Sequence, residues 1–269
     1  MATPQHPLRM PEWIAHRGLS ASAPENTAAS IQLAWLSGVD AVEVDVRLTA
    51  DGEVVLFHDE TLFRLCGLNR KPEEMSLTEL RLLDVGSWKG EQWAGEKIPL
   101  LGDVMRDMPP EKRIYIEVKS GPDIISVLVE LLNRSGLEDS QLSVIAFSME
   151  LASRVKSQRP QTAVYWICDL NDARREMNGK VRPGRLIDLV QKAGLDGLDL
   201  SFSHPARDGE IVRVVKEAGL GCYIWTVDNP ESGQLAIEAG VDGITSNCPS
   251  LLREELVARN GRRLMQPPF

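Results

Sequence analysis

The chain contains 269 residues, 43% of them apolar, which is enough for one sizeable hydrophobic core. Its formal net charge of -9 disfavours a nucleic-acid-binding groove, because such a groove normally needs a basic face. No apolar run is long enough to cross a bilayer, which argues against stable membrane insertion.

The N-terminal segment and the cysteines indicate a soluble, cytoplasmic protein. The segment MATPQHPLRMPEW lacks both the basic start and the apolar core of a signal peptide. The four cysteines are scattered without CxxC spacing, which argues against a disulfide framework or a zinc site. We expect residues 1–269 to form a single domain.

The first predicted strand, Ile14-Ala15, follows a proline-rich arm over residues 1–11. It runs directly into His16-Arg17-Gly18, so a buried segment meets a polar turn that carries an imidazole and a guanidinium. Asn26 or Thr27 can cap the helix that follows, whose apolar positions recur at helical spacing.

The second predicted strand, Ala41–Leu48, alternates apolar and acidic residues. Strand geometry places the carboxylates of Glu43 and Asp45 on one face. An Asp-Gly turn then leads into a hairpin partner, Val54–Phe57, which ends at His58. Two imidazoles, two carboxylates and an arginine at strand ends are more polarity than a packing module tolerates, which indicates an active site.

Residues 60–100 interrupt this pattern and are predicted to be an insertion over the mouth of the fold. One short helix is expected, capped at Ser76 with Glu79 three residues on. The rest is predicted to be loop carrying Trp88 and Trp93, as in many binding loops.

From Arg113 onward, strand and helix patterns alternate regularly. Six strands are predicted, at Ile114–Val118, Leu142–Phe147, Ala163–Cys168, Gly197–Leu200, Cys222–Val227 and Gly243–Thr245. Six helices are predicted, at Asp123–Arg134, Met149–Gln158, Arg185–Ala193, Glu210–Ala218, Pro230–Glu238 and Pro249–Ala258. With the first two strands, eight βα units result, which favours a closed (β/α)₈ TIM barrel. A doubly wound sheet would normally show a glycine-rich phosphate loop after its first strand, and none is visible.

In a barrel, functional side chains gather at the carboxyl ends of the strands. Glu117 and Lys119 reach that end on one face of the third barrel strand, so Glu117 can meet Glu43 and Asp45. Three carboxylates without thiolates favour Mg²⁺ or Ca²⁺, and their mutual repulsion favours a cation there. Trp225 ends a later strand and could be a core residue or a pocket wall.

Each of these features also has a structural interpretation. Alternating acids often form a solvated strand face, although both faces of a barrel strand are covered. Glu117 and Lys119 could form an ion pair, and either histidine alone is more often structural than catalytic. The functional interpretation depends on their coincidence at strand ends.

The chain resembles the glycerophosphodiester phosphodiesterase family over essentially its whole length. The motifs that carry the resemblance are HRG with APENT, EVDVRLTADG, HD followed by ETL, GSWKG with GEKIPLL, IEVK, WTVDN and DGITSN. One departure is LCGLNRK after ETLFR, where the family has a threonine-rich run; we expect this loop to border the leaving-group side of the pocket.

The resemblance implies metal-dependent hydrolysis of a small-molecule glycerophosphodiester to an alcohol and sn-glycerol 3-phosphate. The family's acid/base pair falls on His16 and His58, and its phosphate contacts on Arg17 and Lys119. Its metal ligands fall on three acidic side chains, Glu43, Asp45 and Glu117. We count Trp225 among the substrate contacts.

Three alternatives remain open from the sequence. A lysophospholipase D or phospholipase could use the same site, but no membrane-docking amphipathic segment is evident. A non-catalytic sugar-phosphate binding protein is compatible with the fold, although both histidines are present. A barrel lyase or isomerase would more often use a lysine or carboxylate base. Assembly into a homo-oligomer is left open.

Overall fold

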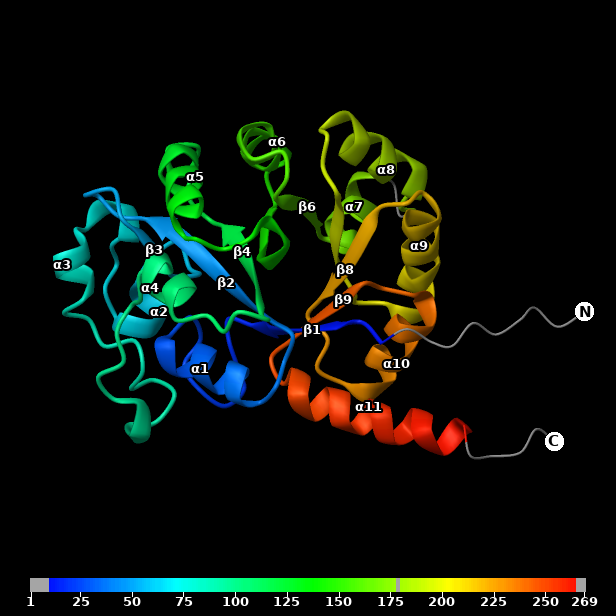
Figure 1. The fold of residues 1–269 in the computed structure, drawn as a ribbon, viewed down its shortest axis with the longest axis horizontal. Helices are drawn as coiled ribbons and strands as arrows, with labels where there is room; N and C mark the ends of the chain where they lie inside the picture. Colours follow the sequence, from blue (N-terminus) through cyan, green and yellow to red (C-terminus); the bar gives the residue numbers. More distant parts are fainter. Residues whose placement is uncertain (1–9, 178–179, 265–269) are drawn as a thin grey trace, which may run out of the picture.

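The computed structural model describes residues 10–177 and 180–264, so most of the predicted N-terminal arm lies outside the described residues. Eight parallel strands form a ring with helices around it (Figure 1). In chain order they are β1 (Glu12–His16), β2 (Ala41–Leu48), β4 (Arg113–Val118), β5 (Leu142–Ala146), β6 (Ala163–Cys168), β7 (Gly197–Ser201), β8 (Gly221–Trp225) and β9 (Gly243–Ser246). Because β1 pairs with both β9 and β2, the ring closes, and the expected (β/α)₈ barrel is confirmed.

Alternation along the strands separates two cores. The valines of β2 pack outward into the large core shared with the helices, while Glu43 and Asp45 point inward. Below the acidic residues, the barrel interior is filled by Tyr115, Tyr165 and Tyr223, whose ring centroids lie 4.6–6.4 Å apart. The interior is therefore a packed core and not a channel.

The outer layer consists of helices that follow the strands. They are α1 (Ala28–Leu36), α5 (Ile124–Arg134), α6 (Met149–Gln158), α7 (Leu170–Glu176), α8 (Pro183–Lys192), α9 (Pro205–Glu217), α10 (Pro230–Ala239) and α11 (Pro249–Leu264). Four glycines that follow helices take left-handed backbone angles, at Gly136, Gly194, Gly219 and Gly240. Helix α7 was not predicted, and α9 begins five residues earlier than predicted. Among the described residues, none of the helices has both the length and the apolar character needed to span a bilayer.

The excursion between β2 and β4 has more structure than the single short helix predicted for it. It contains β3 (Val54–Leu56), α2 (Phe63–Cys66), η1 (Pro72–Glu74), α3 (Leu77–Leu80), η2 (Glu91–Trp93) and α4 (Leu101–Arg106). Strand β3 pairs antiparallel with β2, as the hairpin signal predicted. The excursion lies beside the barrel (Figure 1), and Leu62, Leu80 and Ile98 belong to a small core of its own. This core was not predicted because the apolar residues of the excursion are too sparse to form a regular pattern.

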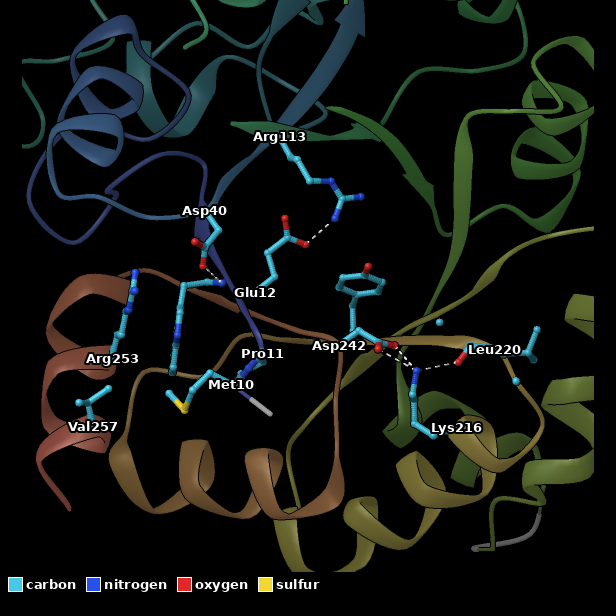
Figure 2. Close-up of a pocket in the computed structure, with 14 residues that line it drawn as sticks. Met10, Pro11, Glu12, Asp40, Arg113, Lys216, Leu220, Asp242, Arg253 and Val257 are labelled. Atoms are coloured by element: carbon cyan, nitrogen blue, oxygen red, sulfur yellow. Dashed lines mark hydrogen bonds and ion pairs between the residues drawn. The ribbon is translucent and has the colours of Figure 1, made fainter. Parts of the chain in front are cut away.

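The amino-terminal end of the barrel carries an open pocket of about 690 Å³. Figure 2 shows Glu12 at the start of β1 and Arg113 at the start of β4 pointing toward each other, 2.8 Å apart. Lys216 and Asp242 form a second ion pair at 2.6 Å (Figure 2). Because function in this fold gathers at the opposite, carboxyl end of the strands, we read this end as a stabilising closure.

Candidate active site

A smaller cavity of about 170 Å³ opens among the carboxyl ends of the strands. It brings together nearly all the side chains predicted from the sequence to form a site. Its lining includes His16, Arg17, Glu43, His58, Glu117, Lys119, Ile145, Phe147, Ile167, Asp199, Trp225, Thr226 and Thr245. Asp45 is fully buried beside it and contacts Arg17 and Lys119.

The three predicted acidic ligands form one cluster. Glu43 and Asp45 lie two apart on β2, and the β2–β4 register pairs Asp45 with Glu117. One carboxylate oxygen from each lies within 4.8 Å of the others, and all three side chains are buried. The sequence prediction that these carboxylates converge therefore agrees with the geometry.

Two positively charged side chains, those of Arg17 and Lys119, lie against this cluster. Arg17 Nε is 3.1 Å from Asp45 Oδ2, and the Arg17 backbone N–H donates to Glu43 Oε2 at 2.9 Å. Lys119 Nζ is 3.3 Å from Asp45 Oδ1 and forms an ion pair with Glu117. Mutual repulsion of the carboxylates therefore favours a metal less strongly than the sequence suggested, because Arg17 and Lys119 offset much of the negative charge.

The three carboxyl groups of the cluster differ in their pKa values. Burial alone would raise the pKa of Asp45, but Arg17 and Lys119 together lower it to about 2. Burial and the neighbouring Asp45 raise the pKa of Glu117 to about 7. Burial, Asp45 and Glu117 also raise the pKa of Glu43 well above its usual value. Without a divalent cation, Asp45 is the carboxylate that holds its charge.

The residues present fit a hard divalent cation. Glu43 Oε1 is buried and has no hydrogen-bond partner, although buried carboxylate oxygens are nearly always partnered. The donor set consists of carboxylate oxygens, the ligands that Mg²⁺ and Ca²⁺ prefer. This orphaned oxygen is a stronger reason to expect a cation than the charge count.

His16, the last residue of β1, has its tautomer set by two residues from the C-terminal part of the chain. The Asp228 carboxylate accepts from Asn247 Nδ2 at 2.6 Å, which turns the amide oxygen of Asn247 toward His16 Nδ1, 2.8 Å away. The proton therefore belongs on Nδ1, and Nε2 keeps its lone pair, 4.0 Å from Glu43 Oε2. Burial, with Arg17 nearby, lowers the pKa of His16 and favours this neutral form.

His58 follows β3 and is oriented by its neighbour in the sequence. Its Nδ1 lies 2.7 Å from Asp59 Oδ1, which leaves Nε2 for the pocket. Burial lowers the pKa of His58 against the opposing effect of Asp45. Asp59 is held by Arg64 Nε at 2.5 Å.

Arg64 connects the part of the site around Arg17 with the part around His58. From α2 it contacts Asp59 and also donates to Glu25 at 2.6 Å, and Glu25 accepts from Arg17 at 2.9 Å. A continuous series of ion pairs therefore runs from Arg17 to Asp59, and a hydrogen bond extends it to His58. The excursion reaches the mouth of the barrel through this arginine.

Several supporting residues were not predicted from the sequence to belong to the site, and Asn26 was considered only as a helix cap, a position that Thr27 takes. Asn26 takes a left-handed backbone angle of +55°, donates to Asp45 Oδ2 at 2.8 Å and accepts from the Asp45 N–H. Asn26, Asp228 and Asn247 all lie in the APENT, WTVDN and DGITSN segments noted for their resemblance. Those motifs were the available signal, because no spacing rule connects residues so far apart in the sequence.

One wall of the cavity is largely apolar. It is formed by Ile145, Phe147, Ile167 and Trp225. Phe147 meets the Trp225 ring edge-on, with centroids 5.8 Å apart, and Trp225 Nε1 donates to the Asp199 carbonyl at 3.2 Å. The structure therefore places Trp225 in the pocket wall, one of the two positions its strand-end location allowed.

A closed (β/α)₈ barrel with buried carboxylates, two cations and two oriented histidines at its carboxyl end defines a barrel hydrolase site suited to a phosphate ester. Residues 16–251 match the glycerophosphoryl diester phosphodiesterase family. The chain belongs to that family and is therefore an enzyme, a phosphoric diester hydrolase.

Individual relatives agree over most of their length. The chain is 31% identical over 244 residues to a glycerophosphodiester phosphodiesterase of Caldanaerobacter subterraneus, covering 89% of this chain and 95% of that protein. An Oleispira antarctica phosphodiesterase, solved in complex with the product sn-glycerol-3-phosphate, is 27% identical with a TM-score of 0.78, covering 92% and 97%. A glycerophosphodiester phosphodiesterase of Agrobacterium tumefaciens is 25% identical with a TM-score of 0.75, covering 91% and 100%.

Proposed function

We propose that the chain hydrolyses glycerophosphodiesters to an alcohol and sn-glycerol 3-phosphate by paired-histidine acid/base catalysis that depends on a divalent cation. The observation that carries the proposal is the placement of His16 and His58 around one cavity with Glu43 and Glu117, each imidazole held through Nδ1. The product complex of the Oleispira antarctica relative supports the choice of substrate class.

Glu43, Asp45 and Glu117 would hold the cation, Mg²⁺ or Ca²⁺. When bound, such an ion supplies Lewis-acid stabilisation of negative charge on phosphate oxygens and a template for the substrate. Arg17 offers a planar fork of donors to the phosphate, and Lys119 offers a point charge. Both side chains now contact carboxylates, so they would exchange part of those contacts for the phosphate on binding.

The two histidines divide the proton transfers. One accepts a proton at Nε2 from the attacking hydroxyl, which is either water or the glycerol 2-hydroxyl, and a new P–O bond forms. The bond from phosphorus to the leaving alcohol breaks, and the other histidine gives a proton to the departing alkoxide. Attack by water gives glycerol 3-phosphate directly; attack by the 2-hydroxyl gives a cyclic phosphate, which water then opens to glycerol 3-phosphate with the histidine roles reversed. Because one histidine must be neutral while the other is protonated, the pH profile of kcat/KM should be bell-shaped. Burial lowers both histidine pKa values, so its ascending limb should lie below pH 6.5.

The histidine assignment is tested by His16→Ala and His58→Ala, assayed for release of glycerol 3-phosphate. Each should lose about 10²–10⁴-fold in kcat, the usual contribution of positioned acid/base catalysis. His204→Ala is the matched control, because His204 is exposed at the start of α9 and away from the cavity. Near-normal turnover by either active-site variant would overturn the assignment.

Comparing glycerophosphocholine with a lysophospholipid as substrate separates the proposed activity from that of a lysophospholipase D. Tight binding of glycerol 3-phosphate without turnover of any diester would instead favour a binding protein. The cytoplasmic location, the single domain and the oligomeric state stay predictions.

A further inference from the structure

Asp199 is a buried carboxyl group that the proposed chemistry does not use. It lies on β7, which stands opposite β2 in the eight-stranded ring, four strands away in either direction. Its side chain lines the active-site cavity and is 5% exposed. Asp199 Oδ1 is buried and has no hydrogen-bond partner.

The surroundings of Asp199 make this unpartnered oxygen costly. Its neighbours in the wall are apolar, and the Trp225 indole is pinned across β7 by its hydrogen bond to the Asp199 carbonyl. A buried polar atom without a partner destabilises a fold, so it usually marks a strained or ligand-binding position. Because Asp199 lines the cavity that holds the catalytic candidates, a substrate bound there is in a position to supply the missing partner.

The protonation state of the Asp199 carboxyl group indicates which kind of substrate group it binds. Burial, with Glu117 across the cavity, raises the pKa of Asp199 well above its usual value, so the neutral acid is favoured. A neutral carboxyl both donates and accepts a hydrogen bond, which suits a hydroxyl group. A phosphate is better served by Arg17 and Lys119, on the far side.

The depth of Asp199 indicates which part of a diester it meets. The leaving alcohol must depart through the mouth at the strand ends, whereas Asp199 lies two residues before the end of β7. The floor is therefore the part of the cavity left for the glycerol unit. With the phosphate and its adjacent hydroxyl at the acidic cluster, the terminal hydroxyl, farthest from phosphorus, is the group free to reach the opposite wall.

We propose that the Asp199 carboxyl group hydrogen-bonds the terminal hydroxyl of the glycerol unit and so selects glycerol diesters over diesters that lack this hydroxyl. The proposal rests on the proposed function, since it takes a glycerophosphodiester as substrate. It makes Asp199 a specificity-determining contact, separate from the acid/base pair and from the cation ligands.

The test compares sn-glycero-3-phosphocholine with its 1-deoxy analogue, in which a methyl group replaces the terminal hydroxymethyl group. Wild-type kcat/KM should be about 10–100-fold lower on the analogue, because the buried carboxyl is left unpaired. Asp199→Val should lose about the same factor on the glycerol substrate and change little on the analogue. Asp199→Asn should keep most of the preference, because a neutral amide also bonds a hydroxyl.

Controls distinguish this contact from other roles. Asp188→Asn removes a carboxylate from the exposed face of α8 and should leave both substrates unaffected. Asp199→Val should unfold at a temperature no lower than the wild type, because it removes an unpartnered polar group.

Several results would overturn the proposal. One is equal wild-type activity on both substrates, and another is an equal loss on both in Asp199→Val. A loss of cation affinity in Asp199→Asn would assign the carboxyl to the metal instead. If the wild type hydrolyses neither diester, the proposed function fails; calorimetric binding of glycerol 3-phosphate and its 1-deoxy analogue then decides on Asp199, and equal affinities overturn the contact.

Discussion

Glu117 is a proposed cation ligand at which a proton competes with the cation. Its pKa of about 7 means that below pH 7 the carboxyl is protonated and must release that proton before it can bind a cation. Affinity for Mg²⁺ or Ca²⁺ should therefore fall as pH drops through 7, approaching about tenfold per unit for this one proton.

Isothermal titration of the cation between pH 5.5 and 8, in buffers of different ionisation enthalpy, measures both the affinity and the protons released. Glu117→Gln should bind more weakly and lose much of the pH dependence. An affinity that stays constant across this range would contradict the proton–cation competition.

Arg64 is predicted to position His58 without touching substrate. Removing it in Arg64→Ala leaves Asp59 as an uncompensated carboxylate beside His58, which should raise the His58 pKa and shift the limb of the pH profile that His58 controls to higher pH. We also expect kcat to fall about tenfold, a typical effect of losing a partner that orients a functional side chain.

Arg64→Lys should recover only part of this loss, because lysine cannot bridge Asp59 and Glu25 with one planar fork. Arg81→Ala, on the exposed end of α3, is the matched control and should leave kcat and the pH profile unchanged. A kcat loss in Arg64→Ala with no shift of the profile would reduce Arg64 to a purely structural part of the excursion.

At the scale of elements, the turn between β1 and α1 depends on Gly18. Its φ of +77° is left-handed, and a Cβ there would lie 2.6 Å from the Ser30 backbone carbon and 2.8 Å from Ile31 N. Gly18→Ala should lower the free energy of unfolding by roughly 2–3 kcal/mol and also reduce kcat, because the turn carries His16 and Arg17.

Gly38 provides the control for this turn. Its φ is +76°, but a Cβ there would meet nothing within 4 Å. Gly38→Ala should cost only the left-handed strain, roughly 1 kcal/mol, with kcat unchanged. Urea unfolding and steady-state kinetics on both variants make the comparison; equal effects would show that contact with α1 does not matter.

At the scale of elements, part of the fold and of the site could be predicted from the sequence. The strands and the convergence of Glu43, Asp45 and Glu117 follow from a period of two and from the shared carboxyl end of parallel strands. Helix α7 has only seven residues, mostly polar, so no periodicity revealed it. Asn247 orients His16 from 231 residues away, a contact that only the closed barrel creates.

For the whole molecule, the ion pairs at the amino-terminal end and the proposed active site lie at opposite ends of the barrel. Arg113 binds Glu12 and Ser143 at the amino-terminal end and lies over the Tyr115 ring. Arg113→Ala should lower the free energy of unfolding by about 1–3 kcal/mol, because it leaves Glu12 partly buried without its cation. Turnover at a temperature well below unfolding should change less than about twofold; a larger change would couple the two ends.

Hydrolysis by this chain depends, we propose, on a divalent cation held by the buried carboxylates at the strand ends. The most direct measurement is release of glycerol 3-phosphate from glycerophosphocholine after exhaustive chelation with EDTA, followed by addition of Mg²⁺ or Ca²⁺. We predict that chelation abolishes turnover and that one of these ions restores it. Turnover that survives complete removal of divalent ions would contradict the account.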